Sequence, residues 1–172
     1  MTERTVFDAI RTMLAVRRYQ DKPIAPSIVR RIVEAGRLTA SSINKQPWHF
    51  VVVEDRETLR KLGGNVRTGP YVADAPLAIV VAVEKNSPFG VSDGSRAIQS
   101  MMLAAWAEGV GSNWIGFGGM HAVRKLLGVP DRLDVLAIVA FGYPASRIRG
   151  TKKKRKPLAE VASRERFGQP FG

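Results

Sequence analysis

The sequence predicts an α+β fold of the layered α/β type, in which helices cover a sheet. Three short apolar runs rich in valine, at residues 50–53, 77–83 and 135–141, predict strands, and the continuous run at 77–83 is typical of a strand covered on both faces. Segments with helical spacing of apolar residues separate these runs. No segment repeats at a fixed period. A single domain over residues 1–172, long enough to bury a core, follows from these observations.

Two helices are predicted before the first strand. Residues 6–15 place Phe7, Ile10 and Met13 at roughly helical spacing, and a basic connector follows as far as Pro23. Pro26 suits the first position of a second helix, whose apolar face continues to about residue 38. After the strand at 50–53, an aspartate can cap a short helix at 56–62, which we expect Gly63-Gly64 to end.

The second half continues the alternation of strands and helices. The strand at 77–83 leads through a loop at 86–94 into a long helix over 95–107. A glycine-rich segment at 110–119 contains Trp114, and a short helix at 121–127 precedes the strand at 135–141. Residues 145–172 are basic and poor in core residues, so we expect this extension to pack on a partner subunit.

Composition excludes several classes of chemistry. The chain has no cysteine and only two histidines, His49 and His121, which argues against disulfides, thiol catalysis and a zinc site. No apolar run approaches the length of a transmembrane helix, and the N-terminus has no signal-peptide core. We therefore expect a cytoplasmic protein that binds no metal and no membrane.

The chain is strongly basic, with a formal net charge of +12. Its densest positive segment is Lys152–Lys156. A run of this kind is typical of a solvated tail or a nucleic-acid arm. Aromatic residues make up only 8% of the chain, and no nucleic-acid-binding motif can be placed, so nucleic acid is not the favoured partner.

The most informative segment is the polar loop Thr39–Trp48, between a helix and a strand. It offers hydroxyls at Ser41 and Ser42 and carboxamides at Asn44 and Gln46, but no nucleophile–base pair. Such a loop suits a large polar heterocycle that carries its own chemistry. Taken alone, the same residues could form a turn with local side-chain caps.

Four ordered segments resemble the FMN-dependent nitroreductase family. Val16–Pro23 resembles the second half of its opening Arg-Arg-Ser-Val-Arg-Arg-Tyr pattern, although Met13-Leu14-Ala15 replaces the first half. Thr39–Trp48 resembles its flavin loop, and Gly111–Gly116 resembles the segment beneath the isoalloxazine ring. Lys153–Leu158 resembles its C-terminal Lys-x-Arg-x-Pro segment. The resemblance covers the chain from about residue 12 to residue 167.

The resemblance implies a role for each matching residue. Arg17 would lie beside the flavin N1/O2 edge, where a cation favours the anionic reduced flavin. Lys153 and Arg155 would bind the FMN phosphate. The backbone of Ile115 and Gly116 would approach N5 and O4, while no side chain acts catalytically. The implied cofactor-binding residues are Arg17, Arg18, Ser41, Ser42, Asn44, Gln46, Asn65, Trp114, Ile115, Gly116, Lys153 and Arg155.

The family also implies a fold and a mechanism. The expected fold is nitroreductase-like, with a central mixed sheet flanked by helices, in a homodimer that exchanges its C-terminal tails. The expected reaction is ping-pong: NADH or NADPH reduces FMN at N5, and an electron-poor acceptor such as a nitroaromatic or a quinone then takes the hydride.

Other functions remain open at this stage. A flavin-binding or flavin-sequestering module with little turnover is one, motivated by Met13-Leu14-Ala15 and by the short chain. A basic nucleic-acid-binding protein on the same fold is another. A third is an enzyme that reduces a different cofactor, such as a deazaflavin.

Overall fold

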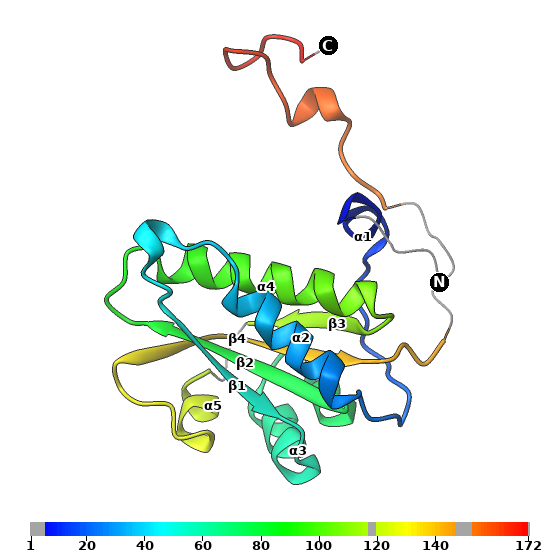
Figure 1. The fold of residues 1–172 in the computed structure, drawn as a ribbon, viewed down its shortest axis with the longest axis vertical. Helices are drawn as coiled ribbons and strands as arrows, with labels where there is room; N and C mark the ends of the chain where they lie inside the picture. Colours follow the sequence, from blue (N-terminus) through cyan, green and yellow to red (C-terminus); the bar gives the residue numbers. More distant parts are fainter. Residues whose placement is uncertain (1–5, 117–119, 147–152, 172) are drawn as a thin grey trace.

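A computed structural model describes residues 6–116, 120–146 and 153–171. Its centre is a four-stranded sheet in the order β1-β2-β4-β3 (Figure 1). The strands are β1 (Trp48–Val53), β2 (Leu77–Glu84), β3 (Gly111–Ile115) and β4 (Leu133–Gly142). The two middle strands, β2 and β4, are almost completely buried, as the continuous apolar sequence of β2 predicted.

The expectation of a mixed sheet is wrong for these four strands. Every paired strand is antiparallel to its neighbour. The long helix α4 (Gly90–Ala107) connects β2 to β3, and these two strands run parallel, but β4 inserts between them. The crossover that the alternating pattern suggested is therefore present, although the strands it joins are not hydrogen-bonded to each other. A parallel contact occurs at the isolated bridge between Ala15 and Ser112.

Two pairs of helices cover the two faces of the sheet (Figure 1). α2 (Pro26–Arg37) and α4 lie on one face, and α3 (Arg56–Asn65) and α5 (Met120–Leu126) lie on the other. Side chains of β2 alternate between the two cores. Ile79 and Val81 pack with α2 and α4, whereas Val80 and Ala82 pack with α3 and α5.

A third, smaller apolar cluster attaches α1 (Val6–Thr12) to the C-terminal end of α4. Its buried residues are Ala9, Val16 and Trp106. Met13 and Leu14 pack against the same cluster, and the Trp106 Nε1–H donates to Thr12 Oγ1 at 2.9 Å. This packing explains why apolar residues occupy two positions at which the nitroreductase pattern has cations.

Most predicted elements are confirmed, with three corrections. Gly63 and Gly64 do not end α3 but belong to it, because Gly63 is buried closely against Ala73 and Pro70. α4 begins at Gly90 rather than Ser95, so its first turn includes Asp93. Residues 111–115, expected as a glycine-rich segment, form the edge strand β3. Short 3-10 helices lie at Ser42–Asn44, Pro70–Asp74 and Leu158–Glu160.

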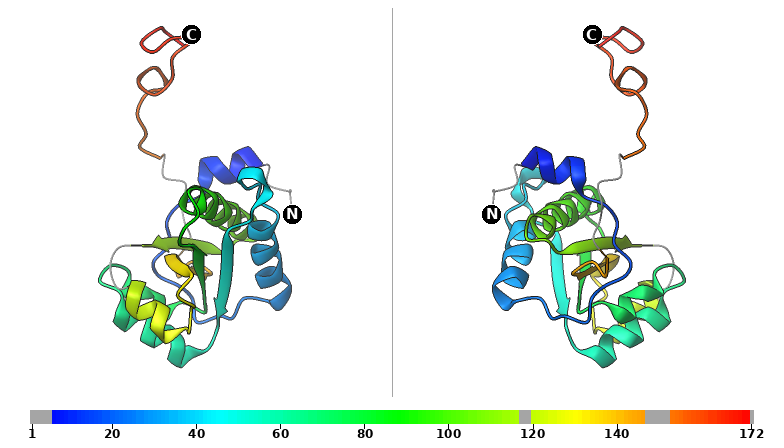
Figure 2. Two further views of the ribbon diagram at one scale, coloured as in Figure 1. Left: turned by 90° about the vertical axis from the view of Figure 1, so that its left-hand side faces the viewer. Right: turned by 90° about the vertical axis from the view of Figure 1, so that its right-hand side faces the viewer.

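The C-terminal residues 153–171 extend away from the layered body (Figures 1 and 2). Leu158, Val161 and Phe167 are exposed in this extension, and Phe167 is completely so. The extension therefore carries large apolar side chains that nothing in the described part of one chain covers. Within that same part of the chain, no helix combines the length and apolar character needed to cross a bilayer.

Candidate functional site

The polar loop before β1 has an unusual backbone. Ile43, Asn44 and Gln46 have positive φ angles of 47°, 56° and 51°. Non-glycine residues rarely adopt this region, and such strain concentrates at functional sites. Two contacts stabilise the conformation from within: the Gln46 N–H donates to Ser41 Oγ at 2.9 Å, and Gln46 Nε2 donates to Asn44 Oδ1 at 3.2 Å.

A buried carboxylate stabilises this loop from outside. Asp93, in the first turn of α4, accepts from the Ser42 backbone N–H at 3.0 Å and from the Ser42 hydroxyl at 3.2 Å. Arg96 Nη2 donates to the same carboxylate. Burial acts to raise the pKa of Asp93, but the Ser42 and Arg96 hydrogen bonds outweigh it and lower the pKa below its usual value. The side chain is therefore ionised at neutral pH.

A second group of candidates lies where the segment after α1 crosses the start of β3. The Val16 N–H donates to the Ser112 carbonyl at 3.0 Å, and the Ala145 N–H donates to the Arg18 carbonyl at 3.0 Å. These backbone bonds fix the path of the segment, while the side chains of Arg17 and Arg18 are exposed. Gly111 permits the crossing, since a Cβ there would lie 2.4 Å from Val16 Cγ2.

Two tyrosines support this edge of the sheet. The Tyr19 hydroxyl donates to the Val16 carbonyl at 2.7 Å, next to Arg17. Burial raises the pKa of Tyr19 far above its usual range, and the neighbouring Tyr71 raises it further. The Asn113 side chain donates to the Tyr71 hydroxyl. Arg17 is therefore an exposed cation on a backbone segment that hydrogen bonds and packing hold in place.

The other end of β3 carries Ile115 and Gly116. Gly69, with a φ of +100°, lies against Ile115. A Cβ on Gly116 would lie 2.6 Å from Trp114 Nε1, so the half-buried backbone at Gly116 is shaped by the indole ring. Trp114 itself packs mainly with the α2–α4 core. From the sequence, the Trp114 side chain could have packed in the core or contacted a cofactor, and the structure shows that it packs against the core.

The tail cations reach the body at α1. Lys153 Nζ donates to the Ile10 carbonyl at 2.5 Å, in the last turn of α1. Burial lowers the pKa of Lys153, and repulsion from the nearby Arg155 lowers this pKa further. The Arg155 side chain is exposed and donates to the Lys154 carbonyl at 2.9 Å. Lys153 thus contacts α1, which packs with Val16, the residue before Arg17.

Asn65 occupies the end of α3. Its Nδ2 donates to the Lys61 carbonyl at 2.7 Å, one turn earlier in the same helix. The side chain is exposed, and its oxygen has no partner among the residues that the structure describes. The proposed contact of Asn65 with a flavin stays a prediction.

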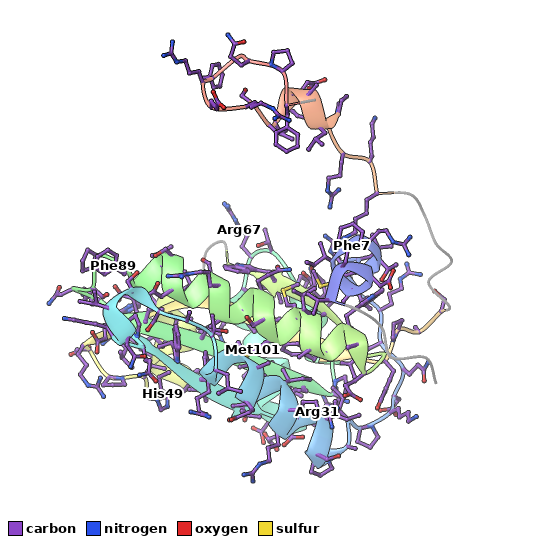
Figure 3. The ribbon with its side chains drawn as sticks, turned by 45° about the horizontal axis from the view of Figure 1, so that its top comes forward. Phe7, Arg31, His49, Arg67, Phe89 and Met101 are labelled. Atoms are coloured by element: carbon purple, nitrogen blue, oxygen red, sulfur yellow. The ribbon has the colours of Figure 1, made fainter. Side chains whose placement is uncertain are left out.

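Within one chain, the candidates form two separate groups. The polar loop contacts Asp93 and Arg96 at the beginning of α4, whereas Val16, the residue before Arg17, packs on Trp106 at its end. Trp106 lies thirteen positions after Asp93 in α4, which corresponds to about 20 Å at 1.5 Å per residue. Figure 3 shows the corresponding landmarks, Phe89 and Phe7, at opposite ends of α4.

The donor set fits a flavin nucleotide. The polar loop presents exposed carboxamides at Asn44 and Gln46, and the β3 edge presents an exposed guanidinium at Arg17. Gly116 has no side chain over its half-buried backbone, and the indole ring of Trp114 lies where a Cβ would be. In the described ranges, no group of three or more histidine, cysteine, aspartate or glutamate side chains could bind a metal ion. His49 and His121 are both exposed and far from forming such a group.

Three residues that support the candidate site were not predicted from the sequence: Asp93, Tyr71 and Asn113. Asp93 lay in a segment expected to be a loop, and its role depends on Ser42, fifty-one residues away along the chain. A signal was available, because a lone carboxylate among small and apolar residues at a helix start is rarely buried without partners. No comparable pattern in the sequence indicates the hydrogen bond between Asn113 and Tyr71.

Comparisons with known proteins agree with this description. A model of the nitroreductase family matches residues 10–88 and 64–143. A Methanothermobacter thermautotrophicus protein, provisionally named an NADH dehydrogenase/NAD(P)H nitroreductase, is 33% identical over 153 residues, covering 84% of this chain and 80% of its own. A protein of the same name from Archaeoglobus fulgidus is 38% identical over 144 residues, covering 78% and 83%.

Solved structures give the same result. A Bacteroides thetaiotaomicron protein with that provisional name matches with a TM-score of 0.86 and 28% identity, covering 94% of this chain and 98% of its own. An FMN-dependent nitroreductase from Clostridium difficile matches with a TM-score of 0.84 and 25% identity, covering 92% and 98%. The resemblance noted in the sequence is confirmed: this chain belongs to the nitroreductase family and is an oxidoreductase of that type.

Proposed function

We propose that the protein binds FMN and uses NADH or NADPH to reduce an electron-poor acceptor such as a nitroaromatic or a quinone. One observation carries the proposal: the chain presents two complementary groups of side chains, each fixed by hydrogen bonds. The loop with the carboxamides of Asn44 and Gln46 is bonded to α4 through Asp93, and Arg17 follows Val16, whose carbonyl accepts from Tyr19. The names of the relatives, which include FMN-dependent and NAD(P)H nitroreductases, support the same reading.

The bound FMN would supply the redox chemistry, accepting and releasing hydride at N5. The chain would supply position and charge. The exposed guanidinium of Arg17 would stabilise negative charge on the reduced ring. Lys153 and Arg155 would bind the phosphate, and the carboxamides of Asn44 and Gln46 would orient the ring and the loop. No side chain needs to act as a general acid, because solvent can supply protons.

We further propose that the complete site forms between two copies of the chain. One chain cannot place its loop and its Arg17 on the same ring, because the loop contacts Asp93 and Val16 packs with Trp106, which lie about 20 Å apart along α4 at 1.5 Å per residue. A second copy in antiparallel orientation would bring its loop to the cationic edge of the first. The exposed apolar residues of the tail would then find cover on the partner subunit.

Absorbance and turnover test this function. The purified protein should be yellow, or should bind added FMN at micromolar concentration. Anaerobic addition of NADH or NADPH should bleach the flavin band, and a quinone should restore it. A colourless protein that does not take up FMN would refute the proposal.

Sequestration of flavin without turnover is a second candidate. It is favoured by the apolar packing of Met13 and Leu14, which leaves two family cation positions without charge near the phosphate. Steady-state oxidation of NADH or NADPH with a quinone separates the two functions. Brisk turnover that depends on FMN would exclude sequestration.

A further inference from the structure

The loop expected to bind FMN contains two neighbouring serine hydroxyls with opposite hydrogen-bonding roles. Ser41 Oγ accepts from the Gln46 backbone N–H at 2.9 Å, so its own hydrogen is left to donate. The Ser42 hydroxyl donates to Asp93 Oδ1 at 3.2 Å, so its oxygen is left to accept. The hydrogen-bond partner within the protein therefore decides whether each hydroxyl can donate to a ligand or accept from it.

The direction at Ser42 is fixed by charge. An ionised carboxylate can only accept hydrogen bonds, so the Ser42 hydroxyl must donate to it. Asp93 has no exposed surface and sits in the first turn of α4, where Arg96 also donates to it. Arg96 Nη2 lies 3.5 Å from Ser42 Oγ, a long contact that takes up little of the oxygen's capacity to accept.

Asp93 also fixes the backbone of the loop. Its second oxygen, Oδ2, accepts from the Ser42 backbone N–H at 3.0 Å. The next residues, Ile43 and Asn44, have positive φ angles, a conformation that costs free energy for residues with a side chain. A bond from a rigid helix to the residue just before this strained pair keeps the loop in one conformation without ligand.

We propose that Asp93 is a positioning residue of the flavin site, which orders residues 41–46 and turns the Ser42 oxygen outward as an acceptor. The inference rests on the proposed flavin function. It specifies the ligand group that faces Ser42: a donor, such as a ribityl hydroxyl or a ring N–H. The phosphate dianion is excluded as the partner of Ser42, because it could only accept.

Two Asp93 variants separate the two roles. Asp93→Ala removes the bond to the Ser42 N–H and should speed hydrogen exchange of the amides in residues 41–46 of the flavin-free protein. Asp93→Asn keeps the size and one accepting oxygen, but its amide group can donate to Ser42 and reverse the direction of the hydroxyl. If Asp93 only ordered the loop and did not set the direction of the Ser42 hydroxyl, Asp93→Asn would bind flavin with unchanged affinity.

Asp55 provides a matched control. It caps α3 by accepting from the Thr58 N–H at 2.8 Å and from the Thr58 hydroxyl at 2.7 Å, the same pair of donors that Ser42 offers to Asp93. Asparagine serves equally well as a helix N-cap. Asp55→Asn should therefore leave flavin affinity unchanged, and any general effect of replacing a capping carboxylate would appear in it.

The experiment titrates the full-length protein with FMN and with riboflavin, which lacks the phosphate, following flavin fluorescence. Asp93→Asn should weaken both ligands by the same factor, about fivefold for the loss of one hydrogen bond. Unchanged affinity in Asp93→Asn, or a loss confined to FMN, would overturn the inference while leaving flavin binding itself intact.

Failure of the proposed function would look different. If the wild-type protein binds neither flavin, the flavin role of Asp93 falls with the proposed function. The exchange measurement would still decide whether Asp93 orders the loop, because it needs no ligand. Equal exchange rates at residues 41–46 in wild type and Asp93→Ala would overturn that part as well.

Discussion

Replacement of Gly69 by alanine tests how tightly the end of β3 is packed. Gly69 has a φ of +100°, and an added Cβ would lie 2.6 Å from Ile115 Cγ1 and 2.9 Å from Ile115 Cγ2. Alanine should cost about 1–2 kcal/mol in backbone strain at positive φ and about 1–3 kcal/mol for overpacking a filled site. The free energy of unfolding should therefore fall by roughly 2–5 kcal/mol.

Gly109→Ala is the matched control for the strain alone. Gly109 also has a positive φ, +77°, but nothing lies within 4 Å of its added Cβ. Both variants gain equally from a stiffer unfolded chain, so the difference between them isolates the collision with Ile115. Urea denaturation at constant pH measures both values.

A double-mutant cycle sharpens the test. In an Ile115→Ala background the clashing atoms are gone, so Gly69→Ala should cost no more than Gly109→Ala. FMN affinity of the Gly69→Ala protein should also fall, because Ile115 and the next residue form the backbone expected under the ring. Equal unfolding free energies for Gly69→Ala and Gly109→Ala would refute the reasoning.

Three further predictions concern charge and hydrogen bonding. Arg17→Ala and Arg155→Ala should each weaken FMN binding by more than about fivefold, on the scale of about 1–3 kcal/mol for a charged contact, as measured by flavin fluorescence; unchanged binding in both would contradict the assigned sites. Tyr19→Phe should lower the free energy of unfolding by about 1 kcal/mol, because the partly buried Val16 carbonyl loses its donor; urea curves that superimpose on the wild type would contradict this. The pKa of Asp93 is lower in the folded chain than in the unfolded chain, so its stabilisation is present above the unfolded pKa of about 3.9 and lost as pH falls through the lower, folded pKa. Acid titration of stability should show this loss in wild type relative to Asp93→Asn, and parallel curves would contradict it.

Local patterns predicted most of the fold. Continuous apolar strands such as 77–83 and the proline-led helix from Pro26 report burial and helix starts directly in the sequence. The pairing of strands is not local, since β4 comes last but inserts between β2 and β3. The predicted end of α3 is wrong because Gly63 packs against Pro70 and Ala73, which lie in another element.

The candidate site shows the same division. The loop Thr39–Trp48 and the exposed Arg17 were recognisable from residue type and order. The Ser42–Asp93 bond joins residues fifty-one positions apart, and the distance between the loop and Arg17 depends on how α4 lies. Sequence patterns identified the groups, but only the fold shows that one chain keeps them apart.

Complementation between two defective variants tests most directly whether the flavin site forms between two chains. Arg17→Ala damages the cationic edge, and Asn44→Ala damages the polar loop. In a mixed dimer of these variants, a composite arrangement puts both changes in one site and leaves the other site intact. Unfolding and refolding an equal mixture should restore tight FMN binding in roughly one quarter of all sites, since half of the dimers are mixed. If both variants assemble and the mixture gains no tight sites, the composite site does not exist.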